Sequence, residues 1–528
     1  MLQKILESGR NLDFPSMETL LKIDKMRLFG QLVLIYYSAG IIYSFGKDAL
    51  IYGFSETIYQ LYKKALSTSF KAFQTVPGTK SLIDSEVNKI VKGFEEKMID
   101  SASKNGIEDT LELPIIGFDP EKTIDILEKR MNEGHIDWKS GRVSGTVYFG
   151  GLEHINLMNK AIGIYNITNP LHPDVFPGLR RLDAEVVSMV LRMFNSPEDG
   201  CGTTTSGGTE SIIMAVRAHL EKAKKERNVT NPNLVAPVTI HTAFDKACGY
   251  FNIELIRIPI DSKSGKVDIR ILEKAINKNT IMIAGSAINY PHGVMDDIEA
   301  MASIAMKKGI GMHVDCCLGS FLMPFMEDAG FKIPKFDFRV PGVTSISCDT
   351  HKYFVCTEWP GGIYASPTIA GSRPGSLIAG CWAALVSIGK EGYITSCRNI
   401  VNSRIKIQQG IESIDELEII GEPICSVVAF SSNSSINIYA INDAMKERGW
   451  GLSVLQHPPA LHIACTALTV GTEDVLIQDL KSSISEVKAN PEKYSKGSAA
   501  MYGMSASLPD KAPVEDITKG YLDSLYST

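Results

Sequence analysis

The ten cysteines of this 528-residue chain form no CxxC pair and no cluster with histidine at the spacing of a zinc site. Cys316 and Cys317 are adjacent and cannot easily bridge each other, and the other eight are scattered. These absences argue against a zinc module and against a disulfide-stapled secreted scaffold. They indicate reduced, mostly buried cysteines in a chain that faces the cytosol.

The chain also lacks an excess of positive charge. Its formal net charge is −6, so there is no electrostatic case for binding nucleic acid. Neither GxxxxGK[ST] nor GxGxxG occurs, and no internal repeat or long low-complexity tract is present. What is there is an ordinary globular composition, 44% hydrophobic and 22% charged, in a chain long enough for two or three structural units.

One segment departs from this composition. Residues 28–46 are 19 consecutive residues without a charge, bounded by Arg27 and Lys47. As a helix the segment would span roughly 28 Å, enough for the hydrocarbon core of a bilayer. A buried helix is the alternative, whereas the mixed-charge leader 1–27 disfavours a signal peptide. We therefore predict a single transmembrane anchor, whose orientation the similar positive charges on both flanks do not decide.

The part of the chain from about residue 180 to 350 alternates between helical and strand-like patterns. Strands separated by helices of this length are typical of parallel βαβ units with helices on both faces of the sheet. Ligands bind outside the carboxyl ends of the strands in such sheets. The predicted strands are 235–240, 255–260, 280–284, 311–314 and 343–348, and the predicted helices are 185–194, 209–225, 267–276 and 298–307.

The pattern restarts near residue 390, which predicts a smaller C-terminal α/β domain. Its predicted elements are a helix through residue 400, strands at 426–430, 436–439 and 461–464, and helices at 443–448 and 515–527.

Three short motifs carry the chemistry. Lys352 follows a strand-like run, where burial lowers the pKa of an amine and lets it form an imine with an aldehyde cofactor. Asp315 ends the run His313-Val314-Asp315, where a carboxylate can hold a pyridine nitrogen protonated. The turn at 206–209 opens a helix whose free N–H groups can bind a phosphate. Together they predict a pyridoxal phosphate site.

Each motif also has a plainer interpretation. Lysines after strands are mostly solvated, aspartates there are often turn formers or helix caps, and Ser/Thr-capped helices are common. His241 can stack on a cofactor ring or can be a structural histidine. Asn169 and His172 lie in a proline-punctuated loop that either binds a polar substrate head or only turns the chain.

Taken together, the motifs resemble those of the sphingosine-1-phosphate lyases, within the fold-type I group that includes the group II pyridoxal phosphate decarboxylases. The similarity covers roughly residues 100–528. The blocks that carry the resemblance are TSGGTES at 205–211, HTAFDK at 241–246, HVD at 313–315, SCDTHK at 347–352 and GGIYASPTIAGSRPG at 361–375, and Tyr502-Gly503-Met504 and the terminal 522–527 also fit. Of these, SGGTES, DTHK and GGIYASPTIAGSRPG together favour the lyases over the amino-acid decarboxylases.

The resemblance implies a role for each of several residues. Lys352 is the Schiff-base lysine and Asp315 pairs with the pyridinium nitrogen, while His241 stacks on the ring and Tyr290 assists proton transfer. The remaining implied contacts are Gly208, Thr209 and His351 at the cofactor phosphate, Ser372 in a loop reaching across a homodimer interface, and Tyr148, Asn169 and His172 at the substrate.

The resemblance further implies cleavage of long-chain base phosphates to phosphoethanolamine and a fatty aldehyde, at the endoplasmic reticulum membrane with the catalytic domain facing the cytosol. The expected fold is α/β, with a mostly parallel sheet flanked by helices. The expected domains are a leader (1–27), an anchor (28–46), a linker with helices (47–110), a large pyridoxal phosphate-binding domain (111–385) and a small domain (386–528).

Two departures from the family pattern stand out. Tyr353 runs directly into Phe354-Val355, where the family has about twenty further residues that include a second lysine and an antiparallel strand. Cys316 replaces the usual alanine, and its small side chain should fit. The gap keeps a catalytically impaired homologue or splice form open as an alternative. An amino-acid decarboxylase of the same fold is a second alternative.

Overall fold

The computed structural model describes residues 52–76, 78–102, 109–133, 137–261, 263–349, 368–433, 436–494 and 512–526, with isolated positions between 38 and 49. The chain divides into two compact units, Met1–Lys64 and Ala65–Thr528. In the first unit the longest described element is the start of α4 (Phe54–Gln74), which continues into the second. Everything that bears on the predicted site lies in the second unit.

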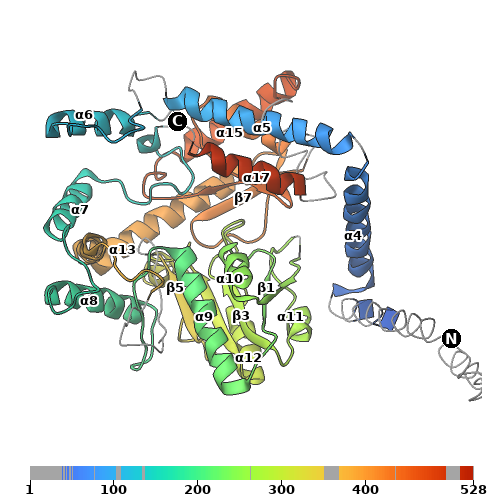
Figure 1. Ribbon diagram of the computed structural model, residues 1–528, viewed down its shortest axis with the longest axis horizontal. Coiled ribbons are helices and arrows are strands. Elements are labelled where there is room, and N and C mark those ends of the chain that lie inside the picture. The colour runs from blue at the N-terminus through green and yellow to red at the C-terminus, as the bar shows by residue number, and fades with distance from the viewer. Residues whose placement is uncertain are drawn as a thin grey trace, which may run out of the picture. The chain divides into compact units, whose positions relative to one another are not determined.

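The second unit contains a five-stranded sheet of order β2-β1-β3-β4-β5 (Figure 1). All four neighbouring pairs are parallel, so the carboxyl ends of the strands share one edge. The strands are β1 (Asn233–Pro237), β2 (Glu254–Ile258), β3 (Thr280–Ser286), β4 (Gly311–Cys316) and β5 (Ser345–Cys348).

Helices connect these strands and cover the sheet. Two of them, α9 and α10, share a buried apolar cluster with β1 and β3. Another, α12, packs on β3 and β4, where Gly285 leaves room for the side chain of Met301. The helices are α9 (Gly208–Arg227), α10 (Ala243–Phe251), α11 (Ile269–Ala275) and α12 (Ile298–Lys308), and the short helix η4 (Met323–Phe325) follows β4.

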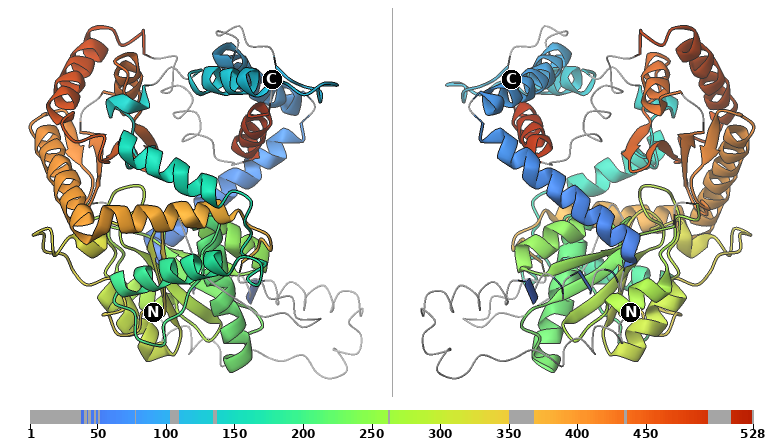
Figure 2. Two further views of the ribbon diagram at one scale, coloured as in Figure 1. Left: turned by 90° about the vertical axis from the view of Figure 1, so that its left-hand side faces the viewer. Right: turned by 90° about the vertical axis from the view of Figure 1, so that its right-hand side faces the viewer.

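A second, antiparallel sheet of order β6-β7-β9-β8 lies toward the C-terminus. Its core is built around the fully buried Trp450, whose indole N–H donates to Asp479 at 2.8 Å. The long helix α13 bends at Gly389 and passes alongside α7, as Figure 2 shows in orange and teal. The elements are α13 (Gly375–Glu412), β6 (Leu417–Ile419), β7 (Val427–Ser432), α14 (Ile438–Glu447), β8 (Ser453–Gln456), β9 (Pro459–Ala464) and α15 (Glu473–Ala489).

The remaining helices precede the parallel sheet or end the chain. The terminal helix α17 (Ala512–Ser524) packs along α5 (Thr79–Ala102), where Gly520 lets the two backbones approach at Val91 (Figure 2). The others are α6 (Pro120–Met131), η3 (Trp138–Ser140), α7 (Leu152–Ile164) and α8 (Pro177–Met193).

The predicted α/β fold with a parallel sheet flanked by helices is confirmed, but one predicted strand is wrong. Residues 436–439 lead into and begin helix α14, because the Asn437 side chain accepts the Tyr439 N–H at 3.0 Å and caps the first turn. The alternating polar and apolar residues come from the end of a loop and from the first, buried residues of the helix. The strands β6 and β8 were not predicted.

Most of the predicted membrane anchor at 28–46 lies outside the described residues, which include only positions 38, 39, 42, 45 and 46 of it. Among the residues that are described, α13 is the one helix long and apolar enough to cross a membrane by length and composition. It packs against α7, α8 and α15 and contributes fifteen buried residues, so we interpret it as a core helix.

Candidate active site

Two of the predicted cofactor residues, Asp315 and His241, lie at the carboxyl edge of the parallel sheet. Asp315 lies in β4, one residue before that strand ends. His241 follows β1 by four positions and directly precedes Thr242, the N-cap residue of α10. Lys352 and His351 follow the end of β5 in the sequence and lie outside the described residues. Because the strands are parallel, the segments that leave them start from the same edge of the sheet.

The glycine-rich turn stands at the N-terminus of α9. Gly207 adopts φ +155 and ψ 170, a backbone conformation that L side chains rarely take, and Gly208 begins the helix. The first helical N–H groups, including those of Gly208 and Thr209, have no acceptor within the helix. They form a cradle of donors at the positive end of the helix dipole, which suits the phosphate of pyridoxal phosphate.

Asp315 is the buried carboxylate of the site, with 5% of its surface exposed. Its Oδ1 accepts the Cys317 N–H at 3.0 Å and the Ser347 hydroxyl at 3.4 Å. Its main-chain carbonyl accepts the Ala287 N–H at 2.8 Å, which ties β4 to the segment after β3. A carboxylate held in this way fits the protonated nitrogen of a pyridine ring, so the residues present are compatible with the cofactor.

His241 is half-buried, and its ring is oriented by its own loop. The Ala243 N–H donates to His241 Nδ1 at 3.1 Å. A ring nitrogen that accepts a hydrogen bond carries no proton, so a neutral His241 has its proton on Nε2. This contact fixes the plane of the imidazole, as a ring that stacks on a cofactor requires.

The predicted substrate residues occupy two places. Asn169 Oδ1 accepts the Leu171 N–H at 3.0 Å and the Arg373 N–H at 3.4 Å, which brings its loop next to the segment of Ser372. His172 and Ser372 are exposed. Tyr148 is 46% exposed and its carbonyl accepts the Ala467 N–H after β9. Asn169 and Ser372 are therefore brought together, whereas Tyr148 lies against the C-terminal part of the chain.

Two charged residues that received no role from the sequence hold the site together. Glu210 accepts the Ser206 N–H and hydroxyl, both at 2.6 Å, and the Ile369 N–H at 2.9 Å. Arg373 donates to the Thr204 carbonyl at 2.7 Å and lies 3.6 Å from Asp183. They fasten segment 368–375 onto the glycine-rich turn. Both residues lie inside recognised motifs, so their importance could have been predicted from the sequence. Their contact partners could not, because Ile369 and Thr204 are far away in sequence.

Tyr290 belongs to the loop between β3 and α12, which contacts the antiparallel sheet. Its ring meets His462 of β9 edge-on, with centroids 4.8 Å apart, and is 50% exposed. His462 Nδ1 is 3.0 Å from the Pro291 carbonyl, and burial lowers the pKa of this histidine to about 4. His292, also buried, has its pKa lowered by burial. Both imidazoles are therefore neutral near pH 7, and that of His462 lies against the Tyr290 ring.

Asp296 lies near the end of the same loop, and its carboxyl group is fully buried. Its Oδ2 accepts the Ser286 N–H at 2.8 Å, and its Oδ1 has no hydrogen-bond partner among the described residues. Burial, with a smaller contribution from the negative charge of Asp315, raises the pKa of Asp296 to about 7. The sequence offered no signal for this residue, since it follows no strand and belongs to no recognised block.

Replacing Asp296 with asparagine should make stability less dependent on pH. The folded-state pKa lies above the ordinary value, so the folded protein holds an extra proton between about pH 4 and pH 7. Raising the pH through that window lowers the free energy of unfolding of the wild type but not of Asp296→Asn. At pH 8 we expect the variant to be more stable by about 2 kcal/mol, because an unpaired buried amide offsets roughly half of the ~4 kcal/mol shift.

Denaturant unfolding of both proteins at pH 4.5 and pH 8 measures this difference. Asp297→Asn is the control, because Asp297 caps the next helix from an exposed position and its charge raises the pKa of Asp296 less than burial does, so most of the wild-type pH dependence should remain. If the free energy of unfolding changed with pH equally in the wild type and in Asp296→Asn, Asp296 would not hold an extra proton in the folded state.

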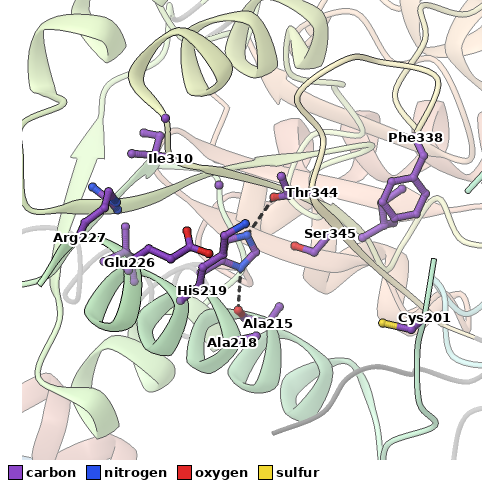
Figure 3. A pocket seen from close by; sticks show the side chains of 16 residues that line it. Cys201, Ala215, Ala218, His219, Glu226, Arg227, Ile310, Phe338, Thr344 and Ser345 are labelled. Carbon is purple, nitrogen blue, oxygen red and sulfur yellow. Dashed lines mark hydrogen bonds between the residues drawn. The ribbon is translucent and has the colours of Figure 1, made fainter. Parts of the chain in front are cut away.

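A cavity of about 460 Å³ lies at the opposite edge of the sheet (Figure 3). The amino ends of β4 and β5 line it together with α9, whose His219 is 3.0 Å from Thr344 Oγ1 and 2.9 Å from the Ala215 carbonyl. It therefore lies at the wrong end of the strands to be the cofactor site. It borders β5, which is the last strand of the sheet among the described residues.

Comparison with known proteins agrees with this geometry. Residues 119–358 match the family described as the pyridoxal-dependent decarboxylase conserved domain. The chain is 42% identical over 505 residues to a sphingosine-1-phosphate lyase of Saccharomyces cerevisiae, covering 90% of this chain and 85% of that protein. A sphingosine-1-phosphate lyase of Dictyostelium discoideum is also 42% identical, covering 86% and 89%.

Solved structures show the same relationship. A sphingosine-1-phosphate lyase of Burkholderia pseudomallei matches with a TM-score of 0.69 and 37% identity, covering 73% of this chain and 95% of that chain. The glutamate decarboxylase of Lactobacillus brevis matches with a TM-score of 0.62 at 17% identity, which shows a shared fold alone. Its extensive identity to curated relatives places this chain in the sphingosine-1-phosphate lyase family of pyridoxal phosphate-dependent enzymes.

Proposed function

We propose that the chain cleaves phosphorylated long-chain sphingoid bases into phosphoethanolamine and a fatty aldehyde. The observation that carries this proposal is 42% identity, over 90% of the chain, to a yeast relative named for that reaction. Similar identity to the Dictyostelium lyase favours it over an impaired homologue. The 17% identity to a glutamate decarboxylase gives no support to amino-acid decarboxylation.

In this proposal the cofactor is held from several sides. Pyridoxal phosphate, when bound, supplies an electron sink for the carbon that loses its bond. Lys352 would attach it covalently, Asp315 would meet its ring nitrogen and His241 would lie against its ring. Its phosphate would be bound by Gly208, Thr209 and His351, and the loop that Arg373 anchors would carry Ser372 across the homodimer interface to the cofactor of the other subunit.

The substrate would be bound by Tyr148, Asn169 and His172. The 3-hydroxyl of the substrate loses its proton, C3 becomes the aldehyde carbon as the C2–C3 bond breaks, and the electron pair remains on C2. C2 then takes up a proton before phosphoethanolamine leaves. We assign assistance in this proton transfer to Tyr290, whose hydroxyl belongs to a half-exposed ring braced by His462.

Product analysis with the purified full-length chain tests the proposal. Incubation with pyridoxal phosphate and sphingosine 1-phosphate should yield long-chain aldehyde and phosphoethanolamine in equal amounts. Carbon dioxide released from amino acids instead would identify a decarboxylase. A folded, cofactor-loaded protein that forms neither product would favour the impaired chain suggested by the short connection after Tyr353.

We also propose a single-pass anchor at residues 28–46 in the endoplasmic reticulum membrane, with the catalytic part facing the cytosol. The support is the uncharged run in the sequence together with a substrate whose acyl chain partitions into a bilayer. Protease protection of the C-terminus in sealed microsomes would contradict this orientation.

We propose further that the protein is a homodimer, with a large domain at 111–385 and a small domain at 386–528. The parallel sheet falls within the first range and the antiparallel sheet within the second. Support for the dimer comes from an apolar stretch left exposed before α6, namely Leu111, Leu113, Ile115, Ile116 and Phe118. A monomeric mass of detergent-solubilised protein in light scattering would contradict it.

A further inference from the structure

Four polar side chains form a continuous line inside the sheet, from the cavity to the candidate cofactor site. His313 and Asp315 alternate on β4, and Ser345 and Ser347 sit opposite them in register on β5. Residues two apart on a strand point to the same face, so all four share one face of the sheet. His313 and Ser347 are fully buried, while Ser345 lines the cavity wall (Figure 3).

Hydrogen bonds join these side chains in series, and the contact to Asp315 is the longest of them. His313 Nδ1 is 2.8 Å from Ser345 Oγ, and His313 Nε2 is 3.1 Å from Ser347 Oγ. Ser347 Oγ is in turn 3.4 Å from Asp315 Oδ1. The ring of Phe244 packs edge-on against the imidazole with centroids 5.8 Å apart, which restricts its rotation.

Asp315, the last residue of this line, determines which atom donates in each of the hydrogen bonds. An ionised Asp315 only accepts, so the Ser347 hydroxyl must donate to it. Ser347 Oγ must then accept from His313, which places the ring proton on Nε2. Nδ1 then carries no proton and accepts a hydrogen bond from the Ser345 hydroxyl. With the proton on Nδ1 instead, Ser347 would donate to the histidine and turn an oxygen lone pair toward the carboxylate.

From this geometry we propose that His313 is a positioning residue for Asp315, acting through Ser347 and held in its Nε2–H tautomer by Ser345. Ser347 and the Cys317 N–H both hold Oδ1, which leaves Oδ2 to meet the ring nitrogen of the cofactor. Burial lowers the pKa of His313 to about 3, which agrees with a neutral ring. The inference rests on the proposed role of Asp315 in binding pyridoxal phosphate.

The tautomer can be measured without any cofactor. Full-length protein labelled with ¹⁵N only in histidine, prepared free of pyridoxal phosphate, shows by ring-nitrogen NMR which nitrogen carries the proton. Ser345→Ala removes the donor to Nδ1 and thereby identifies the His313 signals. We expect a neutral ring with protonated Nε2. A ring protonated on Nδ1 would overturn the relay, whatever the activity of the protein.

Cofactor affinity gives the second measurement. Ser347→Ala should weaken the apparent affinity for pyridoxal phosphate about tenfold with little change in Tm, because a hydrogen bond to a charged group is lost. Ser347→Thr keeps the hydroxyl and should restore the affinity. Ser431→Ala is the matched control, since it deletes a buried strand serine of the other sheet that bonds to Glu418.

The two failures can be told apart. Unchanged affinity in a folded Ser347→Ala protein, or an equal loss in Ser431→Ala, would overturn the positioning role. A wild-type protein that binds no pyridoxal phosphate would overturn the proposed function instead, while the tautomer measurement would still report on the relay.

Discussion

Asp315→Asn should lower kcat of the lyase reaction by roughly 10³-fold, equivalent to about 4 kcal/mol in the barrier. The carboxylate is 5% exposed and is anchored through Oδ1 by Cys317 and Ser347. An amide of the same shape carries no charge, so it cannot hold the ring nitrogen protonated, and the electron sink is weakened when the C2–C3 bond breaks. The expected loss in kcat is large because Asp315 would contact the cofactor ring that accepts the electron pair during bond cleavage.

Steady-state measurement of aldehyde release, with cofactor content determined in the same samples, checks this prediction. The fold should survive, because asparagine accepts the same hydrogen bonds through its Oδ1. Asp297→Asn, at an exposed helix cap, should retain wild-type kcat. Full activity in Asp315→Asn with bound cofactor would show that this carboxylate is not the partner of the ring nitrogen.

Arg373→Ala should lower the free energy of unfolding by about 3 kcal/mol. The Arg373 side chain is 12% exposed, donates to the Thr204 carbonyl and hydroxyl at 2.7 and 2.6 Å, and lies 3.6 Å from the Asp183 carboxylate. Without the guanidinium, the oxygen atoms of Thr204 and Asp183 lose their cationic partner in a mostly buried environment, which destabilises the folded state. Since Thr204 precedes the glycine-rich turn, we also expect weaker binding of pyridoxal phosphate.

Chemical denaturation and cofactor titration measure both effects. Arg270→Ala is the matched control, because the Arg270 side chain is 87% exposed and its solvent-screened pair with Asp268 should contribute little to stability. Arg373→Lys should recover only part of the loss, since one ammonium group cannot reproduce the planar contacts of the guanidinium. Equal stability of Arg373→Ala and Arg270→Ala would contradict the anchoring role.

The parts of the fold that the sequence predicted are those with local signals. The buried runs that became β1, β3 and β4 could be recognised from apolar periodicity, and the turn before α9 from its glycines. The segment 436–439 was misread because a four-residue alternation also fits a capped helix entry at Asn437. Short periodic patterns do not separate these two cases.

The contacts that hold the candidate site together have no local signal. Arg373 meets Thr204 across 169 positions of sequence, and Glu210 meets Ile369 across 159. Asp296 has its pKa raised only because the folded chain buries it beside Asp315. Such properties depend on which segments the fold brings together, so residue type and spacing alone do not reveal them.

Borohydride reduction followed by peptide mass mapping tests the central claim most directly. The full-length protein is incubated with pyridoxal phosphate, reduced and digested. The account predicts a phosphopyridoxyl adduct on the peptide that contains Lys352, and its absence from Lys352→Ala. A folded protein in which Lys352 carries no adduct would contradict the assignment of this lysine and the cofactor chemistry that depends on it.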